Sequence, residues 1–281
     1  MMLFFPFLFG LFVGSFLNVC IVRLPRGRSI VTPPSHCPRC QERIKWYDNI
    51  PVVSFLILRG RCRSCGLPIS WRYPLVELMN GLMYLWAYRT FGMSGDMRDL
   101  AEMAIIMVLS SALIVITFID LDHQIIPDVI TLPGMFIGLA LAPFFMTALT
   151  DHLPFFLERV LSPDAAYARA FLNSLIGLVL GAAPLLIIGW LWEKIKHVEA
   201  MGGGDIKLMG MVGSFLGWKG AFLTIMLGAI SGSLVGGALI LLKKHSADNV
   251  IPFGPFLAAG AAISLFYGGD ILIWYQGLLL P

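Results

Sequence analysis

Long apolar runs without a single charged side chain recur along this chain. Six of them cover residues 1–22, 103–119, 129–150, 170–192, 220–242 and 249–269. A helix that crosses a bilayer needs about 20 apolar residues, so several of these runs are long enough to span a membrane. With two shorter apolar segments included, we expect about eight transmembrane helices, at 2–22, 75–91, 101–119, 129–149, 170–192, 205–217, 220–242 and 256–277.

The composition agrees with this pattern. Of the 281 residues, 58% are hydrophobic and only 13% are charged, and the mean hydropathy is +0.82. Soluble domains carry roughly twice that share of charged residues, about 25%. We therefore predict an all-α polytopic membrane protein. Residues 1–22 lack a basic start and a small-residue cleavage site before Arg23, so we expect them to remain as a helix and not to be removed as a signal peptide.

Positive charge is concentrated in one loop. Ten of the twenty Lys and Arg residues lie between positions 23 and 72. The positive-inside rule then places this loop in the cytoplasm and the N-terminus outside. We expect anionic membrane lipids as a partner of such a loop, whereas a nucleic acid is not expected, because the loop has no groove-reading helix.

The same loop contains two C-x-x-C pairs, Cys37 with Cys40 and Cys62 with Cys65. Two such turns can bring four thiolates to one point and form a tetrahedral S₄ zinc site, which would stabilise a segment too small to have its own core. Disulfides are the competing interpretation, but a cytoplasmic loop is in a reducing compartment. We predict a zinc-ribbon-like loop with a structural ion, because four protein ligands leave no position for a catalytic water. His36 is expected to be a bystander.

Two aspartates lie at the ends of apolar segments. Asp120 follows the third predicted helix, and Asp205 begins the sixth, after Gly202, Gly203 and Gly204. The predicted topology puts both carboxylates on the cytoplasmic side, where they can meet. Two close carboxylates share one proton, so that one can activate water while the other acts as an acid, as in aspartic proteases. Glycines without side chains would let an extended substrate backbone approach, so we predict the three glycines as substrate-binding.

Several neighbouring charged residues have simpler interpretations. Asp122 is expected to face more polar surroundings than Asp120, and Asp128 is expected to cap the N-terminus of the fourth helix. Lys207 is expected to extend to the lipid headgroups, with tuning of the dyad as the alternative. Glu77 is expected in the first turn of the helix at 75–91, where it would interact with the helix dipole; a direct role in the reaction is the alternative.

Small residues mark expected contacts between helices. Gly14 and Ser15 suit close packing of the first helix against a neighbour. Gly228, Gly232, Gly236 and Gly237 recur at helical spacing and predict a close-packing seam on the helix at 220–242.

Three classes of function are compatible with these features. An aspartic endopeptidase uses the dyad to hydrolyse a peptide. A proton-coupled transporter would use Asp120 and Asp205 as a relay, but such transporters tend to contain inverted repeats, and the glycine run has no second copy. A zinc-dependent assembly factor without chemistry would need neither aspartate.

The chain resembles the bacterial type IV prepilin peptidases, bifunctional leader peptidases and N-methyltransferases of pilus and type II secretion systems. The resemblance covers nearly the whole chain. It rests on GSFLN at 14–18, the two cysteine pairs, YPLVE at 73–77, IDLD at 119–122, IPD at 126–128, GGGDIK at 202–207 and PFGP at 252–255.

This resemblance implies a function and an arrangement of parts. It implies Asp120 and Asp205 as the catalytic aspartates of an inner-membrane enzyme that cleaves type IV prepilins or pseudopilins on the cytoplasmic side, after a glycine. It also implies methylation of the new N-terminal residue with S-adenosylmethionine. The expected parts are a first helix at 1–22, a methyltransferase-associated Cys₄ loop at 23–74 and a peptidase core at 75–281. The chain has no G-x-G-x-x-G fingerprint, so the residues that bind the methyl donor stay unassigned.

Overall fold

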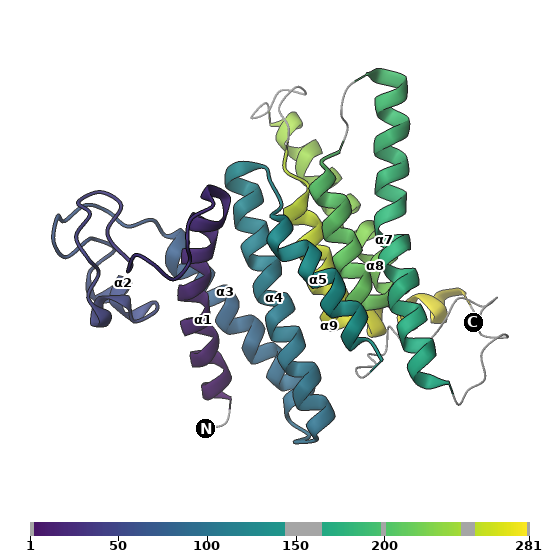
Figure 1. Ribbon diagram of the computed structural model, residues 1–281, viewed down its shortest axis with the longest axis horizontal. Helices are drawn as coiled ribbons and strands as arrows, with labels where there is room; N and C mark the ends of the chain where they lie inside the picture. The colour runs from purple at the N-terminus through teal and green to yellow at the C-terminus, as the bar shows by residue number, and fades with distance from the viewer. Residues whose placement is uncertain (1–2, 144–164, 198–200, 243–250, 280–281) are drawn as a thin grey trace. The chain divides into compact units, whose positions relative to one another are not determined.

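The computed structural model describes residues 3–143, 165–197, 201–242 and 251–279. These residues form helices and connecting turns (Figure 1). The helices are α1 (Phe4–Arg23), α2 (Val53–Ile57), α3 (Arg72–Ala87), α4 (Met97–His123), α5 (Asp128–Leu141), α7 (Ala166–Lys196), α8 (Gly203–Leu241) and α9 (Gly254–Leu279). Within the described ranges only isolated β-bridges occur, and no strand is formed. The all-α prediction is therefore confirmed.

Five of the described helices are long and apolar enough to cross a membrane: α1, α4, α7, α8 and α9. Helices α3 and α5 are shorter, with 16 and 14 residues. The protein is thus a multi-pass membrane protein, while the predicted total of eight spans is not established. The end of the predicted helix 129–149, most of the connection 150–169, and Lys243 with Lys244 lie outside the described residues.

Helix α8 covers two predicted helices, at 205–217 and 220–242, and it is kinked at Gly217, where the first of them was expected to end. Its 39 residues are interrupted at Gly217, which has non-helical angles of φ 66° and ψ −175°. A straight helix of this length would measure roughly 58 Å, about twice the thickness of a bilayer core. Gly217 adopts a positive φ that other residues rarely tolerate. The break therefore separates a short first segment, which begins near Asp205, from a longer second one.

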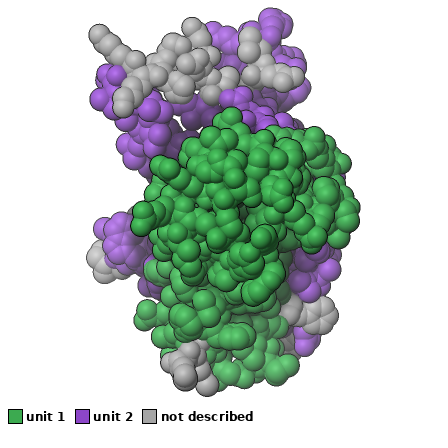
Figure 2. Space-filling model, turned by 90° about the vertical axis from the view of Figure 1, so that its left-hand side faces the viewer, with its two compact units in different colours: residues 1–119 green, residues 120–281 purple. Residues whose placement is uncertain are grey.

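The chain divides into two compact units, Met1–Ile119 and Asp120–Pro281 (Figure 2). In the first unit, α1 and α3 pack closely through glycines. A methyl group on Gly14 would lie 2.7 Å from the Cα of Glu77, and one on Gly10 would lie 2.8 Å from the Cα of Gly81. The side-chain amide of Asn80 donates a hydrogen bond to the Gly10 carbonyl at 2.8 Å. The predicted packing role of Gly14 is confirmed.

In the second unit, glycines bring α8 against α7 and α9. Gly177 of α7 contacts the backbone of Gly213 so closely that neither position has room for a side chain. A methyl group on Gly228 would lie 2.9 Å from the Leu257 side chain of α9, whereas one on Gly237 would meet nothing within 4 Å. The predicted seam therefore exists at Gly228 but does not extend to Gly237.

Candidate active site

Asp120 lies in the last turn of α4 and is only 5% exposed. Its Oδ2 accepts a hydrogen bond from the backbone N–H of Gly254 at 3.0 Å. Gly254 is the first residue of α9, and the N–H groups at a helix start have no partner within the helix and carry partial positive charge. The Asp120 carboxylate therefore satisfies a free donor of α9. A methyl group on Gly254 would lie 2.6 Å from this Oδ2, so any side chain there would displace the carboxylate.

Asp205 lies in the first turn of α8 and is 9% exposed. Its backbone N–H donates to the Gly202 carbonyl at 3.1 Å. Among the described residues, its buried Oδ1 has no hydrogen-bond partner. An unpaired buried acceptor costs free energy, of the order of 1–3 kcal/mol. Such an atom is therefore a natural contact for a substrate group or a water molecule.

The Ile126 side chain packs against Gly204, next to Asp205, and against Gly254, which contacts Asp120. A methyl group on Gly204, the neighbour of Asp205, would lie 2.8 Å from the Cβ of Ile126. A methyl group on Gly254 would lie 3.2 Å from the Cδ1 of the same side chain. The turn after α4 thus packs between the start of α8 and the start of α9, and Asp205 lies within electrostatic range of Asp120. The structure brings the two predicted carboxylates together at one end of the second unit.

The glycine run before Asp205 divides into two parts. Gly202 and Gly203 are exposed, and a methyl group on Gly203 would meet nothing within 4 Å. Gly204 instead packs against Ile126. Open backbone beside a buried acid is what an extended peptide would need. Substrate binding by the three glycines stays a prediction, and its best candidates are Gly202 and Gly203.

Lys207 and Asp128 form an ion pair beside the aspartates. The Lys207 Nζ lies 2.7 Å and 2.8 Å from the two carboxylate oxygens of Asp128. The prediction that Asp128 caps α5 is wrong, because Pro127 occupies the cap position and Asp128 is the first helical residue. That Lys207 extends to the lipid headgroups stays a prediction, and its ammonium contacts Asp128. The pair joins the start of α5 to the first turns of α8, while Asp122 is exposed as predicted.

Glu77 does not interact with the helix start as predicted. Helix α3 begins at Arg72 and has no acid in its first turn. Glu77 is 7% exposed and accepts a hydrogen bond from the backbone N–H of Val52 at 2.7 Å. It also hydrogen-bonds to the side chain of Ser15. Glu77 therefore connects α1 and α3 to the loop that contains the cysteines.

The four loop cysteines form one cluster. Their sulfur atoms all lie within 4.8 Å of one another. Each pair starts on a hairpin turn: the Cys37 N–H donates to the Glu42 carbonyl and the Cys62 N–H to the Leu67 carbonyl, both at 2.9 Å. The backbone N–H of Cys40 and further donors lower the pKa of Cys37 to about 7. The pKa of the neighbouring Cys40 is raised instead, to about 11, so in the cluster without metal only Cys37 of this pair readily becomes the thiolate, the form that binds metals.

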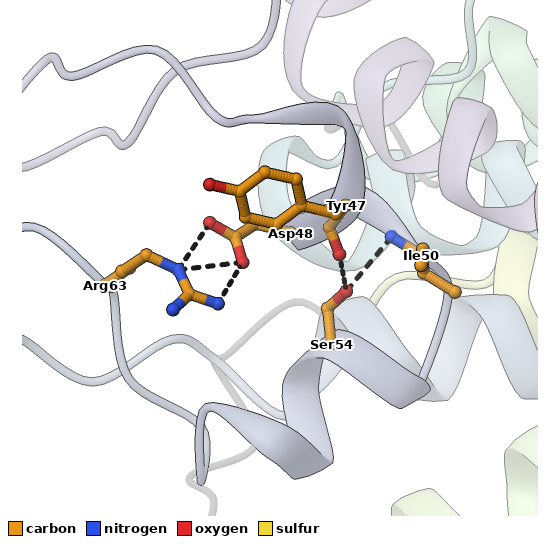
Figure 3. A network of polar contacts seen from close by, with 5 residues as sticks. All are labelled: Tyr47, Asp48, Ile50, Ser54 and Arg63. Carbon is orange, nitrogen blue, oxygen red and sulfur yellow. Dashed lines mark hydrogen bonds and ion pairs between the residues drawn. The ribbon is translucent and has the colours of Figure 1, made fainter.

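An ion pair connects one cysteine hairpin to the rest of the loop (Figure 3). The Arg63 Nε and Nη2 donate to the two carboxylate oxygens of Asp48 at 2.8 Å and 2.7 Å. The Ser54 hydroxyl donates to the Tyr47 carbonyl and accepts from the Ile50 N–H. The hydrogen bonds from Arg63 hold the pKa of Asp48 below its usual value. These contacts give the loop a defined shape around the cluster.

Comparison with known proteins decides the family. Residues 107–237 match the type IV leader peptidase family, and residues 8–91 match the bacterial peptidase A24 N-terminal domain. A prepilin leader peptidase/N-methyltransferase of Stutzerimonas stutzeri is 32% identical over 95% of this chain and 91% of its own length. The chain belongs to the type IV leader peptidase family. The resemblance noted in its motifs is therefore confirmed, and the protein is an enzyme.

Other relatives are also named prepilin leader peptidase/N-methyltransferase. The Pseudomonas aeruginosa protein is 33% identical over 95% of this chain and 91% of its own length. The Myxococcus xanthus protein is 40% identical over 87% of this chain, a match that spans 65% of that relative. No solved structure matches the chain. Asp120 and Asp205 lie within the leader peptidase match, and the four cysteines lie within the N-terminal domain match.

Two contacts of the site were not predicted from the sequence. The PFGP motif at 252–255 is part of the family resemblance, but it does not indicate that the Gly254 N–H reaches Asp120. Ile126 belongs to the IPD motif at 126–128, but its position between Gly204 and Gly254 is a property of the fold that the motif does not encode. A glycine at the first position of a helix, where its N–H is free, was the signal that could have suggested a role for Gly254.

Proposed function

We propose that this enzyme is an aspartic endopeptidase that removes the leader from type IV prepilins or type II secretion pseudopilins and then methylates the new N-terminus. The observation that carries the peptidase half is the meeting of Asp120 and Asp205, both buried, at one end of the second unit. The unpaired Oδ1 of Asp205 offers a contact for the scissile peptide or for water.

The contacts of the two aspartates suggest which of them acts as the base and which as the acid. Asp120 accepts the Gly254 N–H, and a hydrogen bond of this kind stabilises the ionised carboxylate. Asp120 is therefore the base that takes a proton from the attacking water. Asp205 donates its proton to the carbonyl oxygen as the tetrahedral intermediate forms. When the C–N bond breaks, Asp120 gives the proton that it took from water to the leaving nitrogen, and Asp205 takes a proton back from a hydroxyl of the intermediate as the new carboxyl group forms.

The substrate reaches the dyad as extended chain. A peptide bond inside a helix is shielded, and its hydrogen bonds must be replaced when it unfolds in a membrane. The exposed backbone of Gly202 and Gly203 can lie against such a segment without steric conflict. Cleavage after a glycine is the specificity that the family resemblance implies.

The methylating half involves the cysteine cluster and a methyl donor. Four sulfurs within 4.8 Å fit a tetrahedral zinc ion, in which Zn–S bonds of about 2.3 Å place the sulfurs roughly 3.8 Å apart. With Cys37, Cys40, Cys62 and Cys65 as ligands the ion has no open position, so its role is to fold the loop. The methyl group comes from S-adenosylmethionine. We assign the loop at 23–74 to methylation and the core at 75–281 to proteolysis.

The proposed orientation follows from charge. The basic cysteine loop and the dyad face the cytoplasm, the N-terminus lies outside, and the protein resides in the bacterial inner membrane. Anionic lipids lie beneath the loop as partners.

One assay tests both halves. The purified protein is incubated with a prepilin and an isotope-labelled S-adenosylmethionine, and the product masses are read. We expect a mature pilin that lacks its leader and carries one labelled methyl group on its N-terminal nitrogen. An uncut prepilin under conditions in which a characterised relative cuts it would refute the proposal.

A further inference from the structure

A cavity of about 270 Å³ lies in the first unit, between α1 and the loop that follows it. Helix α1 contributes aromatic side chains, the Ser15 hydroxyl and, at its end, Arg23. The loop contributes apolar side chains around Val31, and Asn49 adds an amide. Ligand pockets usually measure about 300–1,000 Å³. A nucleoside-sized ligand would therefore fill this cavity and leave part of its surface outside.

Arg23 gives the cavity a fixed positive charge. Its Nη1 donates to the Ser29 carbonyl at 2.9 Å and its Nη2 to the Pro33 carbonyl at 2.6 Å. Both partners are neutral, and in the described part of the chain no carboxylate forms an ion pair with Arg23. A guanidinium has five N–H donors, so some remain for an anionic ligand.

The rest of the wall suits an aromatic ring and polar groups. Phe12 and Phe16 lie one helical turn apart on α1 and both line the cavity. Ser15, between them, also lines it and hydrogen-bonds to the buried carboxylate of Glu77. The cavity thus combines aromatic surface, a guanidinium and a hydroxyl that is linked to a carboxylate. This combination matches a zwitterionic ligand with a planar ring.

We propose that this cavity binds the methyl donor of the enzyme, with Arg23 on the carboxylate of its amino-acid part and Phe12 and Phe16 against its adenine ring. This inference rests on the proposed methyltransferase function. The other substrate of that reaction, the N-terminus of the trimmed pilin, carries an ammonium group. The donor also carries an ammonium and a sulfonium group, but it has a free carboxylate that Arg23 can pair with, whereas the carboxyl group of the pilin's new N-terminal residue is part of a peptide bond.

The first experiment measures binding, not activity. S-adenosylhomocysteine, the demethylated donor, is titrated by calorimetry into the wild-type protein and the Arg23→Gln variant in neutral-lipid nanodiscs. The same titration uses 5′-methylthioadenosine, which has the adenosine but no amino-acid part. We expect Arg23→Gln to weaken the binding of S-adenosylhomocysteine about tenfold, because one charge-assisted hydrogen bond is lost. Binding of 5′-methylthioadenosine should stay within about twofold, which also shows that the cavity is intact.

The second experiment fills the cavity. Val31 lines it and is 79% exposed, whereas Ile57 of α2 is 70% exposed and lies outside the lining. Val31→Trp should weaken the binding of S-adenosylhomocysteine by about tenfold or more, and the matched variant Ile57→Trp should bind it like the wild type. Circular dichroism and gel filtration check that both variants are folded.

Three results would overturn the assignment, each in a recognisable way. If the wild type methylates pilin but Arg23→Gln and Val31→Trp bind S-adenosylhomocysteine normally, the cavity is not the donor site and the proposed function stands. If phosphatidylglycerol in the nanodiscs displaces the ligand and Val31→Trp abolishes that effect, the cavity is a lipid headgroup site. If the wild type neither binds S-adenosylhomocysteine nor methylates, the methyltransferase function itself fails.

Discussion

Replacing Gly254 by alanine tests whether the backbone at the start of α9 holds the Asp120 carboxylate in place. The added methyl group would lie 2.6 Å from Oδ2 and 3.1 Å from Cγ of Asp120, and 3.2 Å from Cδ1 of Ile126. Contacts under 3 Å force one partner to move. The carboxylate is the partner able to move, because the methyl group is fixed to the helix backbone.

The expected loss of cleavage rate follows from the hydrogen bond that the displaced carboxylate loses. The hydrogen bond from the Gly254 N–H to Asp120, 3.0 Å long, goes to a group that can carry charge, and such bonds contribute about 1.5–3 kcal/mol. A shift of about 1 Å in a catalytic group can lower a rate about 100-fold. We therefore expect Gly254→Ala to lower kcat for prepilin cleavage by about 100-fold, with a much smaller change in KM.

Cleavage of a prepilin by the purified variant in detergent, followed by gel or mass spectrometry, measures this effect. Gly237→Ala is the matched control, because a methyl group there would meet nothing within 4 Å and the residue lies in the same unit. It should cleave like the wild type. Wild-type kcat in a folded Gly254→Ala variant would refute the argument that this N–H positions Asp120.

Three further predictions concern other parts of the molecule. Cys37→Ser combined with Cys40→Ser should lower bound zinc, measured by elemental analysis, and a full complement of metal would refute the S₄ site. Lys207→Met should lower the cleavage rate only modestly, because so exposed an ion pair contributes no more than about 1 kcal/mol. A double variant in which Lys207 and Asp128 exchange their charges should cleave at the wild-type rate. A double variant that cleaves no faster than Lys207→Met would contradict a positioning role for the pair. Because the pKa of Asp48 is lowered in the folded protein, its ion pair stabilises the loop above about pH 4 and loses this effect as the pH falls through the lowered value. The difference in Tm between the wild type and Asp48→Asn should therefore shrink below pH 4, and a difference that grows there would contradict the prediction.

The sequence predicted the meeting of Asp120 and Asp205 because helix number and loop charge decide which end of a helix faces which side. It also predicted the cysteine cluster, since two C-x-x-C turns have few ways to arrange four thiols. These features depend on local patterns and on topology alone. What a particular side chain contacts across the fold, such as Asp120 with the Gly254 N–H, depends on packing that no local pattern encodes.

Two helices, α3 and α5, begin at other residues than their sequence patterns indicate, and this changes the roles of Glu77 and Asp128. The second helix was expected to begin at about Leu75, which would put Glu77 in its first turn. A proline such as Pro74 is tolerated in a first helical turn, and the helix in fact starts at Arg72. That shift places Glu77 in the second turn, buried against Val52. Asp128 was misassigned in the same way, because Pro127 takes the cap position.

The central claim, that Asp120 and Asp205 together hydrolyse the leader peptide, is tested most directly by the amide variants of each aspartate. Asp120→Asn and Asp205→Asn keep the shape of the side chain but remove the group that exchanges a proton, whereas Asp122→Asn makes the same change at an exposed neighbour. Cleavage of a prepilin by each purified, folded variant should vanish for the first two and persist for the third. Undiminished cleavage by either Asp120→Asn or Asp205→Asn would contradict the account.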